Sequence, residues 1–449
     1  MMVLLFQLET TMNKPIFEEL QAFVRGTGRI AVVKAPPGSG KSYNLLEALD
    51  RALADGKRIA IAAQTNNQVD DLCNRFCVRF PQDDIYRFSS DSYERPITLA
   101  DNVSIVTKRD LLPLGPSVMI ATVAKLGFIE FVDEYDVLFI DEAWQMTWAD
   151  FLTMRDVADR YVMIGDPGQI PPTVTIAVDR WEVSPVAPHM PAPEVVLENS
   201  DLRKVTTLFE LDTCRRLPDD AVQLVNNFYD FPFTAFAVVG ERFLRPTKKA
   251  GDSRVDTAIL TLANHSTIIY THPTGPDGAP IETDMELAQV AADFVSRLLA
   301  LQCEVSTSAS ERDAPRKLTA ADIGIVSTHN QMNSAIRSCL PSDLVGEHGI
   351  SVTTPERWQG LERAVMIAVH PLSGVQTPSA FDLETGRLCV MASRHQSACI
   401  FITRDHVGDT LNSHLPAADQ ALGRGDTVGR GHAQHTAFWQ YHEKRNLIV

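Results

Sequence analysis

The chain has 449 residues, is 45% hydrophobic and carries a formal net charge of -16. This length and apolar content exclude a disordered or fibrous protein and allow two or three domains with sizeable cores. The acidic balance excludes a surface that is basic throughout, so a nucleic-acid partner would have to be held in a local groove. Seven thinly spread cysteines favour reduced thiols in a cytoplasmic protein over a disulfide framework.

The chain opens with MMVLLF, a short apolar run that has no basic residue before it. This run matches neither a signal peptide nor a membrane span, and no later segment reaches spanning length. We therefore expect no membrane partner, and Met12 is an alternative start.

Short apolar runs alternate with helical patterns along the chain, which is typical of parallel sheets covered by helices. Five runs in each half predict two sheets. The ten predicted strands cover residues 30–35, 58–63, 117–122, 136–141, 161–166, 267–272, 322–328, 350–354, 365–370 and 399–404.

A proline-rich stretch between the two sets, SPVAPHMPAP at residues 184–193, cannot form a central strand and is interpreted as a connector. We place the domain boundary near residue 200. The first domain then covers 1–200 and the second 201–449, with a C-terminal tail from about residue 412.

Three further segments have weaker patterns. The polar, charged stretch 303–318 is expected to be a surface loop. The sequence GRGDTVGRG, residues 423–431, is expected to be a flexible tether, and residues 436–446 to form a short amphipathic helix.

The stretch VVKAPPGSGKS, residues 32–42, has the context of a phosphate-binding loop, because a strand precedes its glycines and a helical pattern follows. Glycines let the backbone approach a phosphate, and the helix presents its N-terminus to the same anion. Lys41 would reach the β and γ phosphates, and Ser42 would ligate Mg²⁺. The alternative is a plain glycine-rich turn with a solvated lysine. The residues expected to bind the nucleotide are Pro37, Gly38, Ser39, Gly40, Lys41 and Ser42.

The run VLFIDEAWQM, residues 137–146, predicts two carboxylates at the end of a buried strand beside this loop. Asp141 would hold Mg²⁺, directly or through water, and Glu142 would act as general base on the attacking water. A third apolar strand ends in GDPGQIPPTV, where Gln169 would hydrogen-bond the γ phosphate or the lytic water.

Six motifs follow one another along the chain: APPGSGKS, DEAWQ, GDPGQIPPTV, LDTCRRLP, TTPERWQGLE and VMASRHQ. This ordered set resembles the superfamily 1 helicases, most closely their up-frameshift-type branch with DEAxQ and GDxxQLPP motifs. The resemblance extends from about Gln21 to about Arg404. It implies an α/β fold of two RecA-like P-loop NTPase domains, each a mostly parallel sheet covered by helices, with ATP and Mg²⁺ in the cleft between them.

The resemblance also assigns roles to further residues. Arg215 and Arg394 match two arginines that reach the γ phosphate from the second domain, where positive charge stabilises the transition state. For each of these, a surface salt bridge is the alternative. Gln21 looks like the family's adenine-reading glutamine, with a solvated glutamine as the alternative. Gly360 and Glu362 match the motif that couples nucleotide to nucleic acid, with Glu362 near the ribose.

Several residues depart from the family pattern. Cys214 stands where the family usually has a tyrosine that can stack on adenine, which leaves base selectivity open. Arg216 replaces an apolar residue, whereas Ser42 and Ser393 replace threonines and keep the hydroxyl. The segment between the second and third predicted strands is too short for a large inserted domain, so the chain looks like a reduced core.

In this family, single-stranded nucleic acid crosses both domains and is held mainly through its backbone. Hydroxyls and loop N–H groups can bind phosphates without basic side chains, which is compatible with the acidic net charge. Trp144 and Trp358 are expected to fill the core, with base stacking as the alternative. The positions that match nucleic-acid contacts are Thr65, Asn66, Thr122, Pro172, Thr328, His329 and Thr354.

Two pairs of residues are weak metal-site candidates. Cys73 and Cys77 lie one helical turn apart, and His432 and His435 lie close together near the C-terminus. No second pair lies near the cysteines, and the histidine pair is an equally weak candidate, so a metal site is disfavoured at both.

These patterns predict an ATP-dependent superfamily 1 helicase or translocase, whose ATPase is stimulated by single-stranded DNA or RNA. The family branch implies 5′-to-3′ movement. An ATP-gated switch that binds nucleic acid or a protein partner without unwinding is the alternative, favoured by the small accessory content. A small-molecule kinase is a poorer hypothesis because Arg215 and Arg394 would then have no role.

Overall fold

The computed structural model divides the chain into two compact units. The first, unit 1, ends at Thr213; the second, unit 2, begins at Cys214 and also includes Gly168–Ile170. No helix in the part of the chain that the structure describes is long and apolar enough to cross a bilayer. The structure describes residues 14–132, 134–174, 177–181, 184, 186–276, 278–307, 314–346, 348–416 and 426–449.

Unit 1 is built on a sheet whose described strands all run parallel, in the order β4-β3-β5-β2-β6-β7-β1-β8. The strand before the predicted phosphate loop, β1, lies between β7 and β8, and Val32 pairs with both Met163 and Leu208. The strands are β1 (Ile30–Lys34), β2 (Arg58–Ala63), β3 (Ile85–Phe88), β4 (Ser104–Val106), β5 (Ser117–Thr122), β6 (Val137–Ile140), β7 (Tyr161–Gly165) and β8 (Thr206–Glu210).

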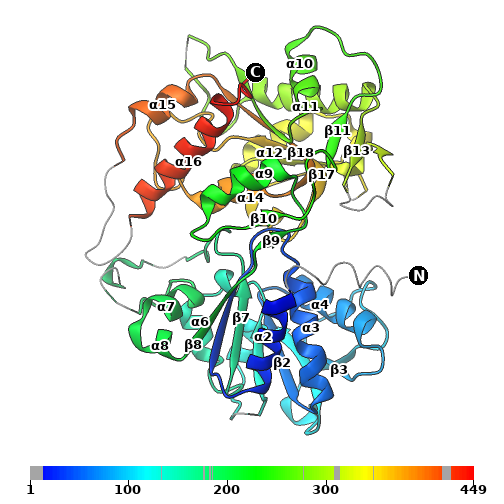
Figure 1. Ribbon diagram of the computed structural model, residues 1–449, viewed down its shortest axis with the longest axis vertical. Helices are drawn as coiled ribbons and strands as arrows, with labels where there is room; N and C mark the ends of the chain where they lie inside the picture. Colours follow the sequence, from blue (N-terminus) through cyan, green and yellow to red (C-terminus); the bar gives the residue numbers. More distant parts are fainter. Residues whose placement is uncertain are drawn as a thin grey trace. The chain divides into compact units, whose positions relative to one another are not determined.

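Helices cover both faces of this sheet (Figure 1). Successive side chains of a strand point to opposite faces, so Val33 packs with Leu45 in one core while Val32 packs with Phe151 in the other. Burial on both sides explains why β1 is apolar from Ile30 to Val33. The helices are α2 (Lys14–Arg25), α3 (Lys41–Ala54), α4 (Asn66–Arg79), α5 (Val123–Gly127), α6 (Trp148–Thr153), α7 (Ala192–Glu198) and α8 (Ser200–Lys204).

Unit 2 contains a second parallel sheet, in the order β12-β18-β17-β15-β16. Its strands are β12 (Thr267–His272), β15 (Ile323–Val326), β16 (Ser351–Thr353), β17 (Arg363–Val369) and β18 (His395–Arg404). Its helices are α9 (Asp219–Val225), α10 (Arg254–Thr261), α11 (Met285–Ala300), α12 (Asn330–Cys339), α13 (Pro355–Trp358), α14 (Thr385–Ala392), α15 (Val407–Ser413) and α16 (Thr427–Glu443).

The unit 2 sheet also has a core on each face. Ile325 packs with Phe294 of α11 on one side, while Val326 packs with Val390 of α14 and Phe438 of α16 on the other. Two small sheets accompany it. They are made of β9 (Thr213–Cys214) with β10 (Thr234–Ala235), and of β11 (Phe243–Arg245) with β13 (Glu304–Ser306) and β14 (Arg316–Lys317).

The predicted fold class, α/β with mostly parallel sheets covered by helices, is confirmed. All ten predicted strands are present, and each belongs to one of the two parallel sheets. Three strands of the first sheet were missed: β3, β4 and β8. Two of them are short, and β8 has mixed exposure because it borders the sheet, so none of the three has a long apolar run.

The structure corrects the segmentation in three places. The stretch 184–193 is not an inter-unit connector, because α7 begins at Ala192 and β8 then joins the first sheet, which moves the division past residue 200 to Thr213. The stretch 303–318 is not a loop throughout, since its ends form β13 and β14, while 308–313 lie outside the described residues. The expected tether at 423–431 is helical from Thr427, and 423–425 lie outside the described residues.

Candidate active site

The phosphate-loop candidate connects β1 to the N-terminus of α3 in unit 1. Gly38 and Gly40 have φ angles of 69° and 79°, which residues other than glycine rarely adopt. The Asn44 amide holds the loop by donating to the carbonyls of Ser39, at 3.3 Å, and Gly40, at 2.9 Å. Ser39 is buried, and its hydroxyl makes no hydrogen bond within the described chain. A positive-φ loop at the start of a 14-residue helix fits a phosphate group.

Lys41 forms an ion pair across unit 1 with Glu142. The Lys41 Nζ and Glu142 Oε1 atoms are 2.6 Å apart, and the two side chains are 16% and 13% exposed. Glu142 follows the buried strand β6 and adopts left-handed backbone angles, with φ at 51°. The carboxylate pair therefore lies beside the phosphate loop, as the strand pattern predicted.

Asp141 lies deeper than Glu142 and is 8% exposed. Burial, together with the neighbouring Glu142 carboxylate, raises the pKa of Asp141 to about 6, while the Lys41 ammonium opposes this shift. Two carboxylates thus face one ammonium in a poorly solvated site. This charge balance fits a divalent cation with oxygen ligands such as Mg²⁺.

Gln169 lies in a segment that belongs to unit 2. It is 8% exposed, and the backbone of this segment packs against α14. A Cβ atom added to Gly386 would come within 2.6 Å of the Ile170 nitrogen and 2.7 Å of the Gln169 carbonyl. The backbone around Gln169 is therefore fixed by close contact, which suits a residue that has to hold one position.

The two predicted arginines of unit 2 have different surroundings. Arg394 follows α14 and is 1% exposed, so a surface salt bridge does not describe it. Arg215 is half-buried, and its guanidinium lies over the Phe236 ring at 4.5 Å from the centroid. Arg242 donates hydrogen bonds to the carbonyls of Arg215 and Arg216, which holds the backbone of this motif.

Glu362 binds two side chains of unit 2. Arg216 forms a short ion pair with Glu362 Oε2, and the Gln396 amide donates to Glu362 Oε1 at 2.8 Å. Burial alone would raise the pKa of Glu362, but the Arg216 charge and these hydrogen bonds outweigh burial and lower it. In the sequence, Arg216 stood out only because it replaces an apolar residue of the resembling family, and no role was predicted for Gln396. The position of Gln396 two residues after Arg394 was the available signal.

Two positions bear on nucleotide base recognition. Cys214 is fully buried, and its Sγ accepts a hydrogen bond from the Leu217 N–H at 3.4 Å, so this position offers no exposed ring or side chain to a base. Gln21 is half-buried on α2 and donates from Nε2 to the Glu47 carbonyl at 3.1 Å. The side chain of Gln21 is therefore partly solvated and partly held by α3, and its contact with adenine stays a prediction.

The residues matched to nucleic-acid contacts lie at the carboxyl ends of neighbouring strands within each unit. In unit 1, Ala63 of β2 pairs with Thr122 of β5, so Thr65 and Thr122 lie at one sheet edge. In unit 2, Val326 of β15 pairs with Thr353 of β16. Consequently Thr328, His329 and Thr354 follow strands that end side by side, whereas Pro172 lies in the segment after β7.

Several of these groups also have structural roles. The Thr65 and Thr122 hydroxyls accept hydrogen bonds from the N–H groups of Gln68 and Lys125 and so cap α4 and α5. Asn66 Oδ1 accepts a hydrogen bond from the buried Arg87 at 2.7 Å. Their contacts with a nucleic-acid backbone remain predictions.

The tryptophans and the paired metal candidates have clear surroundings. Trp144 is 4% exposed, and Trp358 is fully buried with its Nε1 donating to the Ile325 carbonyl at 3.1 Å, so both fill the core. Burial raises the pKa of Cys73 to about 12. Among the residues that the structure describes, no cluster of three or more His, Cys, Asp or Glu side chains could hold a metal.

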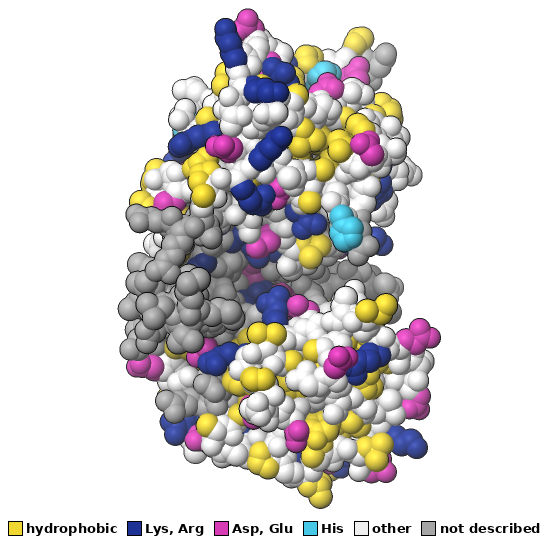
Figure 2. Space-filling view, turned by 90° about the vertical axis from the view of Figure 1, so that its right-hand side faces the viewer, with side chains coloured by type: hydrophobic (Ala, Val, Ile, Leu, Met, Phe, Trp, Pro, Cys, Tyr) yellow, Lys and Arg dark blue, Asp and Glu magenta, His cyan; other side chains and the backbone are white. Residues whose placement is uncertain are grey.

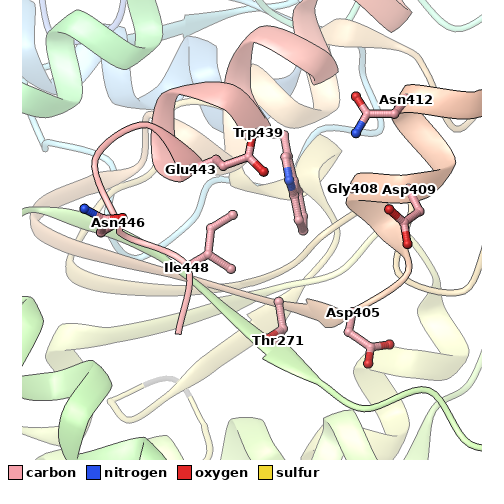
Figure 3. A pocket seen from close by; sticks show the side chains of 9 residues that line it. All are labelled: Thr271, Asp405, Gly408, Asp409, Asn412, Trp439, Glu443, Asn446 and Ile448. Carbon is pink, nitrogen blue, oxygen red and sulfur yellow. The ribbon is translucent and has the colours of Figure 1, made fainter.

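A pocket of about 470 Å³ lies elsewhere in unit 2, between α15, α16 and the end of β12 (Figure 3). No residue predicted for nucleotide or nucleic acid lines it. Its lining residues are Thr271, Asp405, Gly408, Asp409, Asn412, Trp439, Glu443, Asn446 and Ile448.

Comparisons with known proteins agree with the geometry of unit 1. Residues 17–175 match a family model described as an AAA domain. Over 174 residues, 37% of its length, the chain is 24% identical to the DNA replication ATP-dependent helicase/nuclease DNA2 of Saccharomyces cerevisiae, and it covers 11% of that protein. These matches support a helicase-type, nucleotide-binding family.

Solved helicase structures resemble the chain only distantly. An Arterivirus nonstructural protein 10 helicase is 14% identical with a TM-score of 0.42, covering 88% of this chain and 63% of its own. The PRRSV helicase is 12% identical with a TM-score of 0.41, covering 87% of this chain and 55% of its own. The chain therefore spans less than two thirds of each.

Proposed function

We propose that the protein is an ATP-dependent superfamily 1 helicase or translocase of the up-frameshift type, which moves 5′-to-3′ on single-stranded nucleic acid. The observation that carries this proposal is the Lys41–Glu142 ion pair, which joins the phosphate loop to the carboxylates after β6. A kinase for a small acceptor would need the phosphate loop but gives no role to Glu142 as a base for water.

In this proposal Lys41 exchanges its contact with Glu142 for the β and γ phosphates of ATP. Glu142 is then released to accept a proton from the attacking water, while the bond between the β and γ phosphates breaks and ADP leaves. Ser42 and Asp141 would hold Mg²⁺, which neutralises phosphate charge when bound. Arg215 and Arg394 would stabilise the charge that develops on the γ phosphate.

Two observations support a nucleic-acid partner. The matched threonines and His329 follow strands that end together in each unit, where loop N–H groups and hydroxyls are available to phosphates. On the face drawn in Figure 2, Lys and Arg side chains of unit 2 are interspersed with Asp and Glu side chains, so cationic groups are present there although the chain is acidic. The match to a DNA replication helicase/nuclease points the same way.

The second candidate is an ATP-gated switch that binds nucleic acid or a protein without unwinding. The segment between β2 and β5 favours this candidate. It contains α4, β3 and β4, and β3 and β4 join the same sheet as β2 and β5. This segment therefore contributes no separate inserted domain that would act as a wedge between duplex strands.

The test is the steady-state ATPase rate of the wild type and Lys41→Ala, with no polymer, with single-stranded DNA and with single-stranded RNA. Stimulation by one polymer that disappears in the variant supports the motor and identifies its substrate. ATPase activity that ignores both polymers contradicts it. Strand displacement from duplexes with a 5′ or a 3′ overhang then tests direction, and stimulation without displacement favours the switch.

A further inference from the structure

Two tilted rings and a guanidinium group form one cluster in unit 2, here called the stack. Phe381 lies in the segment between β17 and α14, and its ring centroid is 6.0 Å from that of His329, with an interplanar angle of 37°. On α14, the Arg387 guanidinium carbon lies 4.0 Å from the Phe381 centroid. The stack therefore brings together the start of α12, the loop after β17 and the first turn of α14.

The stack is solvent-accessible on one side and supported on the other. Phe381 is 46% exposed, whereas the Arg387 side chain is 15% exposed, so the guanidinium covers the Phe381 ring from the protein side. Arg387 is itself fixed, since Nε donates to Glu356 Oε1 at 3.0 Å and Nη1 donates to the Phe381 carbonyl at 3.2 Å. A ring held in this way loses little conformational freedom when a ligand stacks on it.

The position of the stack matches the predicted path of a nucleic-acid strand. His329 follows β15, and Glu356, which holds Arg387, lies two residues after Thr354, which follows the neighbouring strand β16. Both strands end at the same edge of the sheet. The stack is thus next to two positions that the family resemblance assigns to nucleic acid.

The carboxylates around the stack are occupied by local donors. Asp382 accepts hydrogen bonds from the Ser379 N–H and hydroxyl at 2.9 and 2.7 Å. Glu384 accepts from the backbone N–H groups of Gly386 and Arg387 at 2.8 and 3.0 Å. These bonds partly compensate the negative charge that would otherwise repel a phosphate backbone.

We propose that His329 and Phe381 form a stacking platform for a nucleobase of single-stranded nucleic acid, with Arg387 as the positioning residue behind Phe381. Aromatic and histidine rings are the side chains on which unpaired bases stack, and this contact tolerates every base and both sugars. The inference rests on the proposed function. It adds a base contact to a partner that is otherwise held through its backbone.

The test compares the binding of a fluorescent oligothymidylate and of an abasic oligomer of the same length. Phe381→Leu keeps an apolar side chain and removes the ring, His329→Ala removes the second ring, and Phe381→Trp keeps a stacking surface. Leu260→Ala is the matched control, because Leu260 is also 46% exposed in unit 2 and lies on α10, outside the predicted sites.

We expect Phe381→Leu and His329→Ala each to weaken binding of the base-bearing oligomer about five- to tenfold, the lower part of the range for losing one base stack. The affinity of Phe381→Leu for the abasic oligomer should equal that of the wild type. His329→Ala, whose residue is also matched to a backbone contact, should lose more affinity for the base-bearing oligomer than for the abasic one. Phe381→Trp should keep the preference for the base-bearing oligomer, and Leu260→Ala should bind both oligomers normally. Because backbone contacts weaken steeply with salt and stacking does not, the preference for the base-bearing oligomer should persist at high salt.

Other results separate the platform from the motor. If the variants lost affinity equally for both oligomers, or lost none, the platform would be refuted. If a polymer still stimulated the ATPase in that case, the proposed function would stand. A wild-type protein that binds neither oligomer and shows no stimulation would refute the proposed function itself.

Discussion

Units 1 and 2 have the same architecture, a parallel sheet with helices on both faces, and both bury ion pairs, such as Arg404–Asp284 in unit 2. They differ because unit 2 also buries several histidines. In unit 1 the buried charges are paired, as in Lys41–Glu142 and in Arg87–Asp70 at 3.0 Å. Unit 2 buries four histidines whose pKa values are lowered. Of the 12 histidines in the chain, His189 alone lies in unit 1. The unit 2 histidines with lowered pKa values are His370, His395, His435 and His442.

The two units should therefore respond differently to changes in the charge of their buried side chains. Unit 1 keeps charged groups at the ends of its strands, where the proposed hydrolysis needs a cation and a base. Charging the buried imidazoles of unit 2 should destabilise it, because a charge in an apolar core is strongly penalised. Changes in unit 1 charges should therefore alter turnover, whereas acid should act mainly on the stability of unit 2.

The largest expected effect is that of Glu142→Gln on turnover. The amide keeps the size of the side chain and its contact with Lys41 but cannot accept the proton of water, so the ATPase rate should fall about a thousandfold. ATP binding should persist. Two quantities should be measured: the rate of ATP hydrolysis in a single turnover, and the equilibrium affinity for the nucleotide.

Glu47→Gln is the matched control for this change. Glu47 pairs with Arg79 at 2.9 Å on the adjoining helices of the same unit and should leave the rate unchanged. Equal rate losses in both variants would mean that Glu142 acts through the stability of unit 1 and not as a base.

A tryptophan truncation in each unit should be the next largest effect. Trp358→Ala leaves a cavity beside Gly324 and removes the partner of the Ile325 carbonyl, which should cost unit 2 about 3–5 kcal/mol. Trp144→Ala should destabilise unit 1 in the same way. Hydrogen exchange read by mass spectrometry would assign each loss to one unit. If either truncation loosened both units equally, the two would have to unfold together.

Acidification should have a smaller effect that lowers the stability of unit 2. In unit 1 the raised pKa of Asp141 acts the opposite way, because the folded state takes up this proton at a higher pH than the unfolded chain. Burial lowers the pKa of His395 and His442 to about 4 and that of His435 to about 3. Between pH 6.5 and these values the unfolded chain binds protons that the native unit does not, so the free energy of unfolding falls as pH falls. We expect a loss of about 1 kcal/mol for each of these histidines from pH 6.5 to 5.5, which is less than the roughly 1.4 kcal/mol for a group that is fully protonated in the unfolded chain over that range.

The measurement is denaturant unfolding of the wild type and His435→Leu over this pH range. The variant lacks one titrating imidazole, so its stability should depend less steeply on pH. A slope identical to that of the wild type would show that His435 takes up no proton when unit 2 unfolds.

The smallest effect is expected from Arg216→Leu, which introduces an apolar residue where the resembling family has one. Without the Arg216 charge the pKa of Glu362 should rise, and the carboxylate loses one of its two side-chain donors. We expect KM for ATP to change about fivefold, equivalent to about 1 kcal/mol, with little effect on kcat. An unchanged KM across pH would mean that Glu362 does not contact the nucleotide.

The strands of both sheets were predictable because burial on two faces demands continuous apolar sequence. This held for β1 and β6, and also for β15 and β17 of the second sheet. It failed for β8, where exposed, half-buried and buried positions alternate at the border of the sheet. The unit boundary was misplaced for the same reason, since β8 joins the first sheet after the proline-rich stretch.

Local order along the chain was also sufficient to predict the phosphate loop and the carboxylates that follow β6. Both patterns are recognisable from a few consecutive residues. One is a glycine loop between a strand and a helix, and the other is an acidic pair after an apolar run. Their approach, through the 2.6 Å contact of Lys41 and Glu142, follows from the way parallel strands end at one edge of a sheet.

The remaining features depend on residues far apart in the sequence, which only the tertiary structure brings together. Arg216 contacts Glu362, and Phe381 contacts both His329 and Arg387, although no local pattern links these positions. The burial of the unit 2 histidines is likewise invisible in a sequence where histidine is compatible with surface and core. Sequence determined the strands and the motifs, because each depends on neighbouring residues; packing alone decided which charges and rings would meet.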